Sequence, residues 1–190
     1  MKLDLNEFRR QIGWQNVVTE VRDADTERPY GVIRVLPRSQ DLPAIEIWGT
    51  SDLDSYGEVW FVGWDACYDE DGAVELVAGL VAGEMTILQE LGPDDKVMSL
   101  SPLAAEKSPR ELHDKAVKWR KIYFDREAET LNIDLSQFLR VPYGWICLED
   151  AKAVYDEDPS AFDFWQLPDA EREALKEKFL SMTTMSPDEG

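Results

Sequence analysis

The 190-residue chain has little of the usual equipment for covalent or zinc chemistry, with two cysteines and one histidine. Two cysteines are too few for a disulfide framework and are typical of a reducing compartment. A structural zinc site takes four ligands, usually Cys or His, and only three such residues occur. A Cys–His pair through His113 and either Cys67 or Cys147 has no local signature. The sequence therefore disfavours structural zinc and a cysteine nucleophile.

Long apolar runs and nucleotide motifs are absent as well. No stretch of about 18 apolar residues occurs, and the opening residues, MKLDLNEFRR, lack the apolar segment of a signal peptide. There is no G-x-S-x-G elbow, no P-loop and no dinucleotide fingerprint. From these absences we expect a cytoplasmic protein that uses no cofactor.

Positive charge is absent from a long window. No Lys or Arg occurs between Ser39 and Asp95, which holds fourteen Asp or Glu residues within a chain of net charge −19. Disordered acidic segments are poor in aromatic residues, whereas this window contains Trp48, Trp60 and Trp64 among apolar runs. We interpret the window as a folded element with a negative field. Such a field repels nucleic acid and anionic membranes and attracts basic protein surfaces.

The hydrophobic pattern predicts an α+β fold. An N-terminal helix over 4–13 and an antiparallel sheet of about five strands are expected within residues 1–100, and a mostly helical half within 101–190, together forming one compact unit. The expected strands of the sheet include 17–22, 31–36, 44–48 and 58–65, and a separate strand is expected at 143–148 in the second half. The expected helices cover 109–124, 134–140, 149–155 and 169–182. Residues 73–83 fit a strand or a buried helix, and we interpret them as a strand.

The alternation of residues in 44–48 and 58–65 predicts a sheet face that mixes carboxylates with indoles, opposite an aliphatic face. Aromatic residues are typical anchors of protein interfaces, and carboxylates steer basic partners. The candidate partner-binding residues are Glu46, Trp48, Asp52, Asp54, Glu58, Trp60, Trp64, Asp65, Asp69, Glu70 and Asp71. An incidental acidic face, with the tryptophans in the core, is the competing interpretation.

The run Asp69-Glu70-Asp71-Gly72 was compared with a calcium-binding loop. Aligning Gly72 with the invariant glycine puts Cys67 at the first position and Ala78 at the twelfth, so the opening ligand and the bidentate Glu are both missing. We interpret the run as an Asp-Gly hairpin turn and expect no metal there. A site built from acids far apart in the sequence stays open.

These features favour a non-catalytic acidic inhibitor that occupies the basic, nucleic-acid-binding groove of a partner such as a nuclease complex. It would act as a DNA mimic, and phage anti-CRISPR proteins, anti-restriction proteins and immunity proteins against nuclease toxins share this size and charge. A carboxylate-dependent hydrolase or metal-dependent enzyme is the alternative, and a structural adaptor the third. The basic residues in 109–124 are expected to pair with the protein's own acids rather than with nucleic acid.

Overall fold

The structure, a computed structural model, describes residues 4–22, 30–50 and 56–183. The chain divides into two compact units. The first unit comprises the residues up to Ser108 together with Ala116–Asn132, and the second comprises Pro109–Lys115 together with the residues from Ile133 onwards. The division therefore does not coincide with the expected one near residue 100, because the chain enters the second unit briefly and returns.

Helix α1 (Leu5–Ile12) opens the first unit and confirms the predicted N-terminal helix. Asp4 caps it, since its side chain accepts a hydrogen bond from the backbone N–H of Asn6 at 2.8 Å. Gly13 ends it in the left-handed conformation, with φ 67°. Phe8 and Ile12 are its buried residues, one turn apart on the same face.

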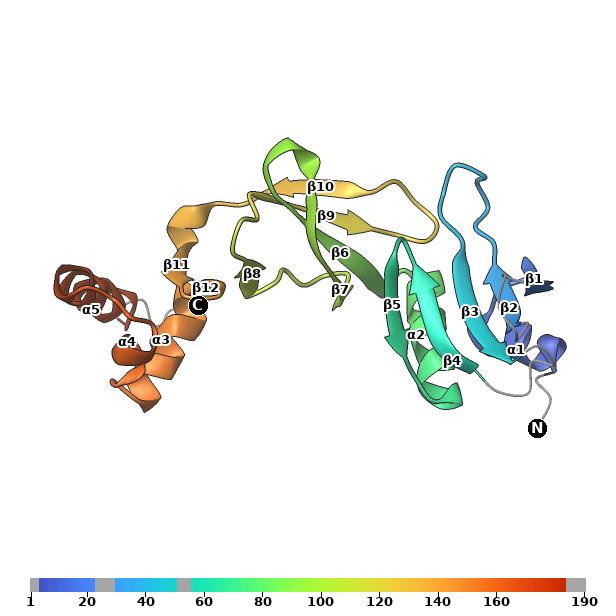
Figure 1. Ribbon diagram of the computed structural model, residues 1–190, viewed down its shortest axis with the longest axis horizontal. Coiled ribbons are helices and arrows are strands. Elements are labelled where there is room, and N and C mark those ends of the chain that lie inside the picture. Colours follow the sequence, from blue (N-terminus) through green and yellow to red (C-terminus); the bar gives the residue numbers. More distant parts are fainter. Residues whose placement is uncertain (1–3, 23–29, 51–55, 184–190) are drawn as a thin grey trace, which may run out of the picture. The chain divides into compact units, whose positions relative to one another are not determined.

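The predicted five-stranded antiparallel sheet is confirmed. Its strands are β1 (Val17–Arg22), β2 (Tyr30–Val35), β3 (Ile45–Thr50), β4 (Tyr56–Phe61) and β5 (Trp64–Cys67), paired in sequence order so that β1 and β5 form the edges (Figure 1). The single strand expected over 58–65 is instead two strands joined by Val62 and Gly63. Both turn residues have positive φ, 54° and 84°. Two-residue turns of this kind match the right-handed twist of paired strands.

Helix α2 (Glu70–Ala82) corrects two expectations. Residues 73–83 are helical rather than extended, and Asp69 to Gly72 is a helix start rather than a hairpin turn. The Asp69 carboxylate accepts the backbone N–H of Gly72 at 2.8 Å, as an N-cap does, and Gly83 ends the helix at φ 73°. The buried residues Ala73, Val77 and Leu80 recur every three or four positions, which is a helical period that the short apolar run concealed.

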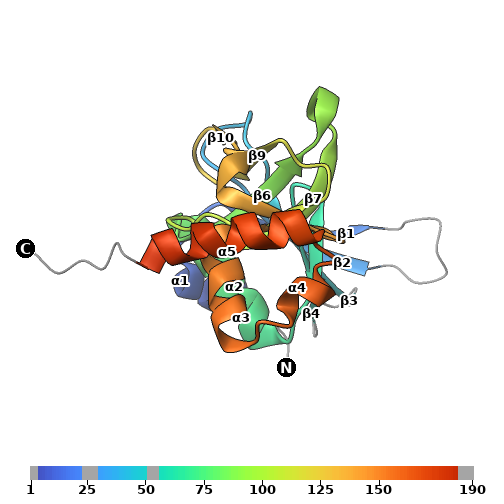
Figure 2. The same cartoon turned by 90° about the vertical axis from the view of Figure 1, so that its left-hand side faces the viewer.

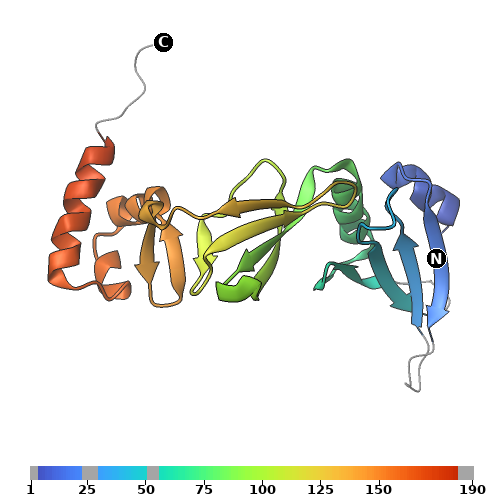
Figure 3. The ribbon, with the colours of Figure 1, turned by 90° about the horizontal axis from the view of Figure 1, so that it is seen from above.

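The core of the first unit lies between α1, α2 and one face of the β1–β5 sheet (Figure 3). That face is aliphatic and aromatic, as predicted. Its fully buried side chains are Ile33, Val35, Ile45, Ile47, Val59 and Phe61, each at most 1% exposed. They pack against Phe8, Ile12, Val77 and Leu80 of the two helices. The opposite face of the sheet is therefore free of the helices and carries the polar residues.

A second sheet in the same unit has the order β10-β9-β6-β7. Its strands are β6 (Met85–Leu91), β7 (Val97–Ala104), β9 (Lys118–Ile122) and β10 (Glu129–Asn132), all antiparallel, with the short 3-10 turn Pro93–Asp95 between β6 and β7. The predicted helix over 109–124 is wrong, because β9 and β8 (Glu111–His113) occupy it. Ladder pairing with β6, such as Leu88 opposite Lys121, outweighs the local helix-start signal at Ser108.

In its described residues the second unit combines a small sheet with the helices α3, α4 and α5, and Figure 2 shows these helices. β11 (Phe138–Val141), β12 (Gly144–Cys147) and β8 pair antiparallel in the order β11-β12-β8. α3 (Leu148–Glu157), α4 (Ala161–Phe164) and α5 (Asp169–Thr183) follow, which confirms the strand expected at 143–148 and the helices expected at 149–155 and 169–182. The helix expected over 134–140 is wrong: a 3-10 turn, Leu135–Gln137, leads into β11.

Candidate partner-binding surface

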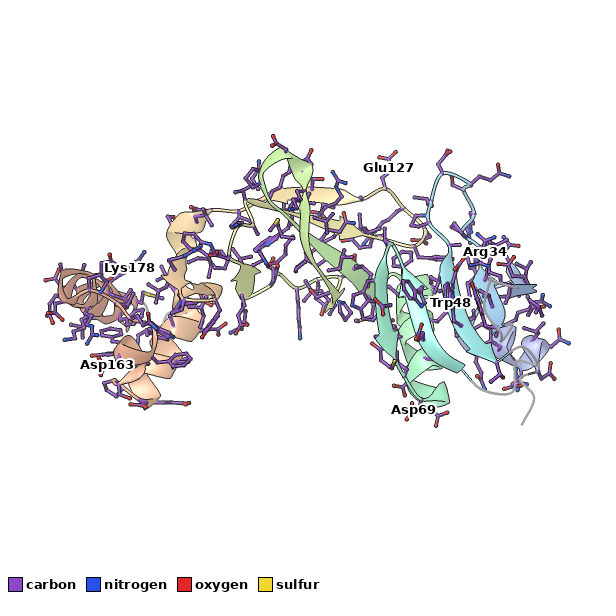
Figure 4. The ribbon with its side chains drawn as sticks, in the orientation of Figure 1. Arg34, Trp48, Asp69, Glu127, Asp163 and Lys178 are labelled. Atoms are coloured by element: carbon purple, nitrogen blue, oxygen red, sulfur yellow. The ribbon has the colours of Figure 1, made fainter. Side chains whose placement is uncertain are left out.

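Four of the candidate residues lie on the outer face of the β1–β5 sheet within its two strands β3 and β4. Glu46 lies opposite Trp60, and Trp48 lies opposite Glu58, across the β3–β4 ladder. All four side chains are half-buried. The predicted mixture of carboxylates and indoles on one face is therefore present, and Figure 4 shows Trp48 and Arg34 on it.

The aromatic rings on this face stack on one another. Tyr30 and Trp48 have ring centroids 4.8 Å apart at 20°, and Trp48 and Trp60 have centroids 5.0 Å apart at 24°. Tyr30, which the sequence reasoning missed, lies on β2, next to β3 in the sheet. The stack covers both faces of the Trp48 indole, so these rings contribute to the stability of the sheet before they contribute to any interface.

Each indole is also bonded to a carboxylate two residues away on its own strand. Trp48 Nε1 donates to Glu46 Oε2 at 3.0 Å, and Trp60 Nε1 donates to Glu58 Oε2 at 2.9 Å. Residues at i and i+2 of a strand point to the same face, so the period of two that is visible in the sequence produces both bonds. Hydrogen bonds to charged acceptors are the stronger kind.

Glu46 is not a free negative charge. Arg22 donates to both its carboxylate oxygens, at 2.8 and 3.1 Å, and Arg34 Nε lies 3.2 Å from Oε1. Burial by itself would raise the pKa of Glu46, but hydrogen bonds from Arg22 and Trp48 and the two guanidinium charges outweigh it and hold the pKa below its usual range. Two bases from β1 and β2 therefore neutralise this candidate residue from within the protein.

Trp64 lies on the other face of the sheet from the one predicted. It pairs with the buried Phe61 across the β4–β5 hairpin and packs against the core of the first unit, with its ring 6.3 Å from that of Tyr68. In one continuous strand residues 61 and 64 would point to opposite faces, whereas the two-residue turn places them on the same face. The same change of parity brings Asp65 opposite Trp60, on the outer face, where it is exposed.

The remaining candidates lie at α2 or outside the described residues. Asp69 and Asp71 are exposed in the N-cap and first turn of α2 (Figure 4 labels Asp69). Asp52 and Asp54 fall within 51–55, outside the described residues, as does the side chain of Glu70.

The described acids from Glu58 to Glu84 differ from those elsewhere in the first unit in their basic partners. Within the described part of the chain, no Lys or Arg lies within 4 Å of Glu58, Asp65, Asp69, Asp71, Glu75 or Glu84. The acids that do form ion pairs lie at Glu46 or before it, or at Asp95 or after it. We call Glu58, Asp65, Asp69, Asp71 and Glu75 the acidic edge. Glu58 lies on β4, Asp65 lies on the edge strand β5, and the other three lie in the N-cap and first turns of α2.

Some acids of this edge also have a structural role. The N-terminus of a helix carries a partial positive charge, which stabilises Asp69 and Asp71 in the first turn of α2, and Asp69 caps that turn. Asp71 and Glu75 are four residues apart and share one face of the helix. With the other described residues, the side chains of Asp65, Asp71 and Glu75 form no hydrogen bond or ion pair, so the fold makes the least use of these three charges.

Two bases of residues 109–124 pair with acids of their own unit, as expected, and a third bonds to a backbone carbonyl. Arg110 forms an ion pair with Asp150 in the second unit, and Lys118 forms one with Asp95 in the first. Lys121 is buried, 6% exposed, and donates to the carbonyl oxygen of Ala105 at 2.7 Å. Arg110, Lys118 and Lys121 therefore each contact a residue of their own unit.

Metal-ligating side chains do not gather in the described ranges: no group of three or more His, Cys, Asp or Glu residues there could hold a metal ion. Among the helices described, none is both long and apolar enough to span a membrane.

Cys147 precedes α3, where burial raises the pKa of its thiol, and its Sγ lies 3.2 Å from Asp150 Oδ2.

Comparison with known proteins gives this chain no relative: no protein-family model, no curated protein and no solved structure matches it significantly.

Proposed function

We propose that the chain is a non-catalytic binding protein whose acidic edge occupies a basic, nucleic-acid-binding groove of a partner protein. In this proposal the acids take the place of phosphates, as in a nucleic-acid mimic. Inhibitors of bacterial defence nucleases, such as phage anti-CRISPR or anti-restriction proteins, and immunity proteins against nuclease toxins are the two kinds of protein with this chemistry.

The observation that carries the proposal is the absence of basic partners along the acidic edge. The first unit does bring bases to acids elsewhere, since Arg22 and Arg34 contact Glu46 and Lys118 contacts Asp95. It brings none within 4 Å to the described acids from Glu58 to Glu84. Unpaired like charges repel one another, and mixed-sign surfaces are the common outcome. A basic partner would relieve that repulsion on binding.

The position of the edge supports the same use. Asp65 lies on the outer face of the edge strand β5, and Asp71 and Glu75 lie on the helix that follows directly. Only a short connection separates β5 from α2. The regular backbone of both elements therefore fixes the distances between these carboxylates before the partner binds. Preorganised charges steer encounter and cost little ordering entropy on binding.

The alternative, a carboxylate-dependent hydrolase or metal-dependent enzyme, needs acids that converge in a concave pocket and perturb one another's pKa values. The acidic edge spreads its charges along a strand and a helix instead. The arrangement of the acidic edge therefore favours a binding surface over an enzyme site at these residues.

Two charge-reversed variants test the proposal. The edge variant changes Asp65, Asp71 and Glu75 to Lys, and the matched variant changes Glu157, Glu171 and Glu177, exposed acids of the second unit, to Lys. Each reversal alters the charge by two, so both variants have a net charge of −13 instead of −19. Asp69 is left intact because it caps α2. The partner is isolated with the tagged wild-type protein and purified, and its affinity for each form is measured by calorimetry.

The edge variant is expected to bind the partner about 100-fold more weakly, and the matched variant within about threefold of wild type. Wild-type affinity should fall steeply with salt, because exposed charges are screened beyond about 8 Å at physiological ionic strength. Duplex DNA or RNA should displace the protein from the partner. Equal losses in both variants would assign the binding to bulk charge, and unchanged affinity in both would reject the acidic edge.

A further inference from the structure

The second unit contains a pocket of about 560 Å³ that is independent of the acidic edge. Small-molecule sites commonly have volumes of about 300 to 1,000 Å³ and mostly apolar walls with a few polar groups. Here β8, the β11–β12 hairpin, α3 and α4 all contribute to the lining. The walls include Leu112, Trp145, Ile146 and Trp165, and most of the lining is apolar.

The walls are fixed by packing. Trp165 and Leu112 are 6% and 5% exposed, and Trp165 belongs to the helical core of the unit. β12 approaches β8 so closely at Gly144 that a Cβ atom there would lie 2.2 Å from the carbonyl oxygen of Leu112. Gly144 also has φ 154°, which a side chain would strain. The pocket is therefore formed before any ligand binds.

Two large side chains at the pocket are left in solvent. Tyr143 is 87% exposed and Phe164 is 72% exposed, and both belong to the lining. Single exposed apolar residues are ordinary on protein surfaces, but exposed aromatic rings beside a preformed apolar pocket are typical of a binding site. Their rings can cover a ligand that enters the pocket.

The charged groups of the lining are both carboxylates. Glu111 and Asp158 line the pocket, and no Lys or Arg does. Hydrogen bonds from the Ser160 side chain and from its backbone N–H, the latter 2.9 Å from Asp158 Oδ1, hold the pKa of Asp158 below its usual range. Arg140 lies over the Trp145 ring, 5.2 Å from its centroid, but pairs with the Asp114 carboxylate.

We propose that this pocket binds a small organic ammonium ion with an apolar body. The apolar body contacts Leu112, Ile146 and Trp165, and the ammonium group lies near Glu111 and Asp158 and against the aromatic rings. Aromatic faces attract cations, and carboxylates at the same opening add to that attraction. A second copy of this chain is a poor occupant, because each copy carries a net charge of −19.

The test compares three probes that share the 4-phenylbutyl group as their apolar body: 4-phenylbutylammonium, 4-phenylbutan-1-ol and 5-phenylpentanoate. Binding to the full chain is followed by NMR through the indole N–H signals of its seven tryptophans, assigned with Trp→Phe variants. The ammonium probe is expected to shift the signals of Trp145 and Trp165 and to bind about fivefold more tightly than the alcohol. The carboxylate probe is expected to bind more weakly than the alcohol.

Two kinds of variant separate charge from shape. The nearly isosteric pair Glu111→Gln and Asp158→Asn should remove the preference for the ammonium probe and leave the affinity of the alcohol unchanged. Val154→Phe, which adds bulk to the lining on α3, should weaken all three probes. The neighbouring Ala153→Phe is the matched control, because Ala153 is exposed and outside the lining, and it should change nothing.

A free amine and a lysine side chain present the same ammonium group, so the capped peptide acetyl-Ala-Phe-Lys-Ala-amide is a fourth probe. Binding of this peptide without binding of the free amine would overturn the proposal in favour of a docking site for protein segments. Equal affinity for the three small probes would also overturn it, since the carboxylates would then take no part. Shifts confined to tryptophans of the first unit would show that the probes bind elsewhere.

Discussion

Glu58 and Trp60, two residues apart on β4, are joined by a hydrogen bond of 2.9 Å from the indole Nε1 to the carboxylate. The same arrangement recurs between Glu46 and Trp48 on β3, and the two indoles stack with centroids 5.0 Å apart. On this acidic, tryptophan-rich sheet face, both indole N–H groups thus find their hydrogen-bond acceptors on the same face. Trp48 and Trp60 are therefore held in place within the sheet by their own carboxylates and by each other.

Trp48 is the centre of the stack, so its truncation should destabilise the first unit. Trp48→Ala removes two ring contacts, each worth about 0.5 to 1.5 kcal/mol, and we expect a loss of about 2 kcal/mol in the free energy of unfolding measured in urea. Trp48→Phe keeps a ring in the stack and should lose clearly less. If the two variants lose the same amount, the indole N–H bond to Glu46 is the dominant contribution.

Glu46 should stabilise the protein in a pH-dependent way. Its folded-state pKa lies below the value of about 4.3 for an unfolded Glu, so its contribution is fully present above that pH and is lost as the pH falls through the folded-state pKa. At pH 7, Glu46→Gln should lower the free energy of unfolding by about 1.5 kcal/mol, because Arg22 and Arg34 lose a charged partner.

The difference between wild type and Glu46→Gln should shrink below about pH 4, as unfolding at several pH values would measure. Glu84→Gln serves as the control, because Glu84 is exposed and has no ion pair in the described chain, and it should change stability by less than about 0.5 kcal/mol at either pH. A constant difference for Glu46→Gln across the acid range would contradict the ion cluster.

Asp69 should act as a helix cap. Asp69→Ala removes the bond to the Gly72 N–H and is expected to cost about 1 kcal/mol of stability, whereas Asp69→Ser should retain most of the capping. Asp71→Ala is the matched control, since Asp71 does not cap the helix, and it should cost less than about 0.5 kcal/mol. Chemical unfolding with far-ultraviolet circular dichroism measures both changes.

Substitutions at the two residues of the β4–β5 turn should change the free energy of unfolding in opposite directions. Val62 has φ 54°, which costs a β-branched residue about 1 to 2 kcal/mol, while its side chain packs only partly against the core. Val62→Asn should therefore raise the free energy of unfolding by about 0.5 kcal/mol. Gly63→Ala, at φ 84°, should lower it by about 1 kcal/mol. A destabilised Val62→Asn would mean that the packing of Val62 outweighs its backbone strain.

The sequence by itself determined those features that depend on neighbours along the chain. The helix at Leu5–Ile12 with its cap at Asp4 and its stop at Gly13, and the pairing of each indole with the carboxylate two residues away, follow from local spacing. The first three strands of the meander also followed, because they pair in chain order and alternate between a buried and an open face.

Only the tertiary structure decided what depends on partners distant in the chain. Lys118–Ile122 is a strand because β6 lies beside it, although Ser108-Pro109-Arg110-Glu111 is a good helix start. Trp64 faces the core because a two-residue turn, with an uncommon valine at positive φ, divides the predicted strand. Glu46 lost its role as a free charge because Arg22 and Arg34 come from two other strands. Ion pairs and ladder hydrogen bonds form across space, and the order of residues along one segment does not specify which distant group will complete them.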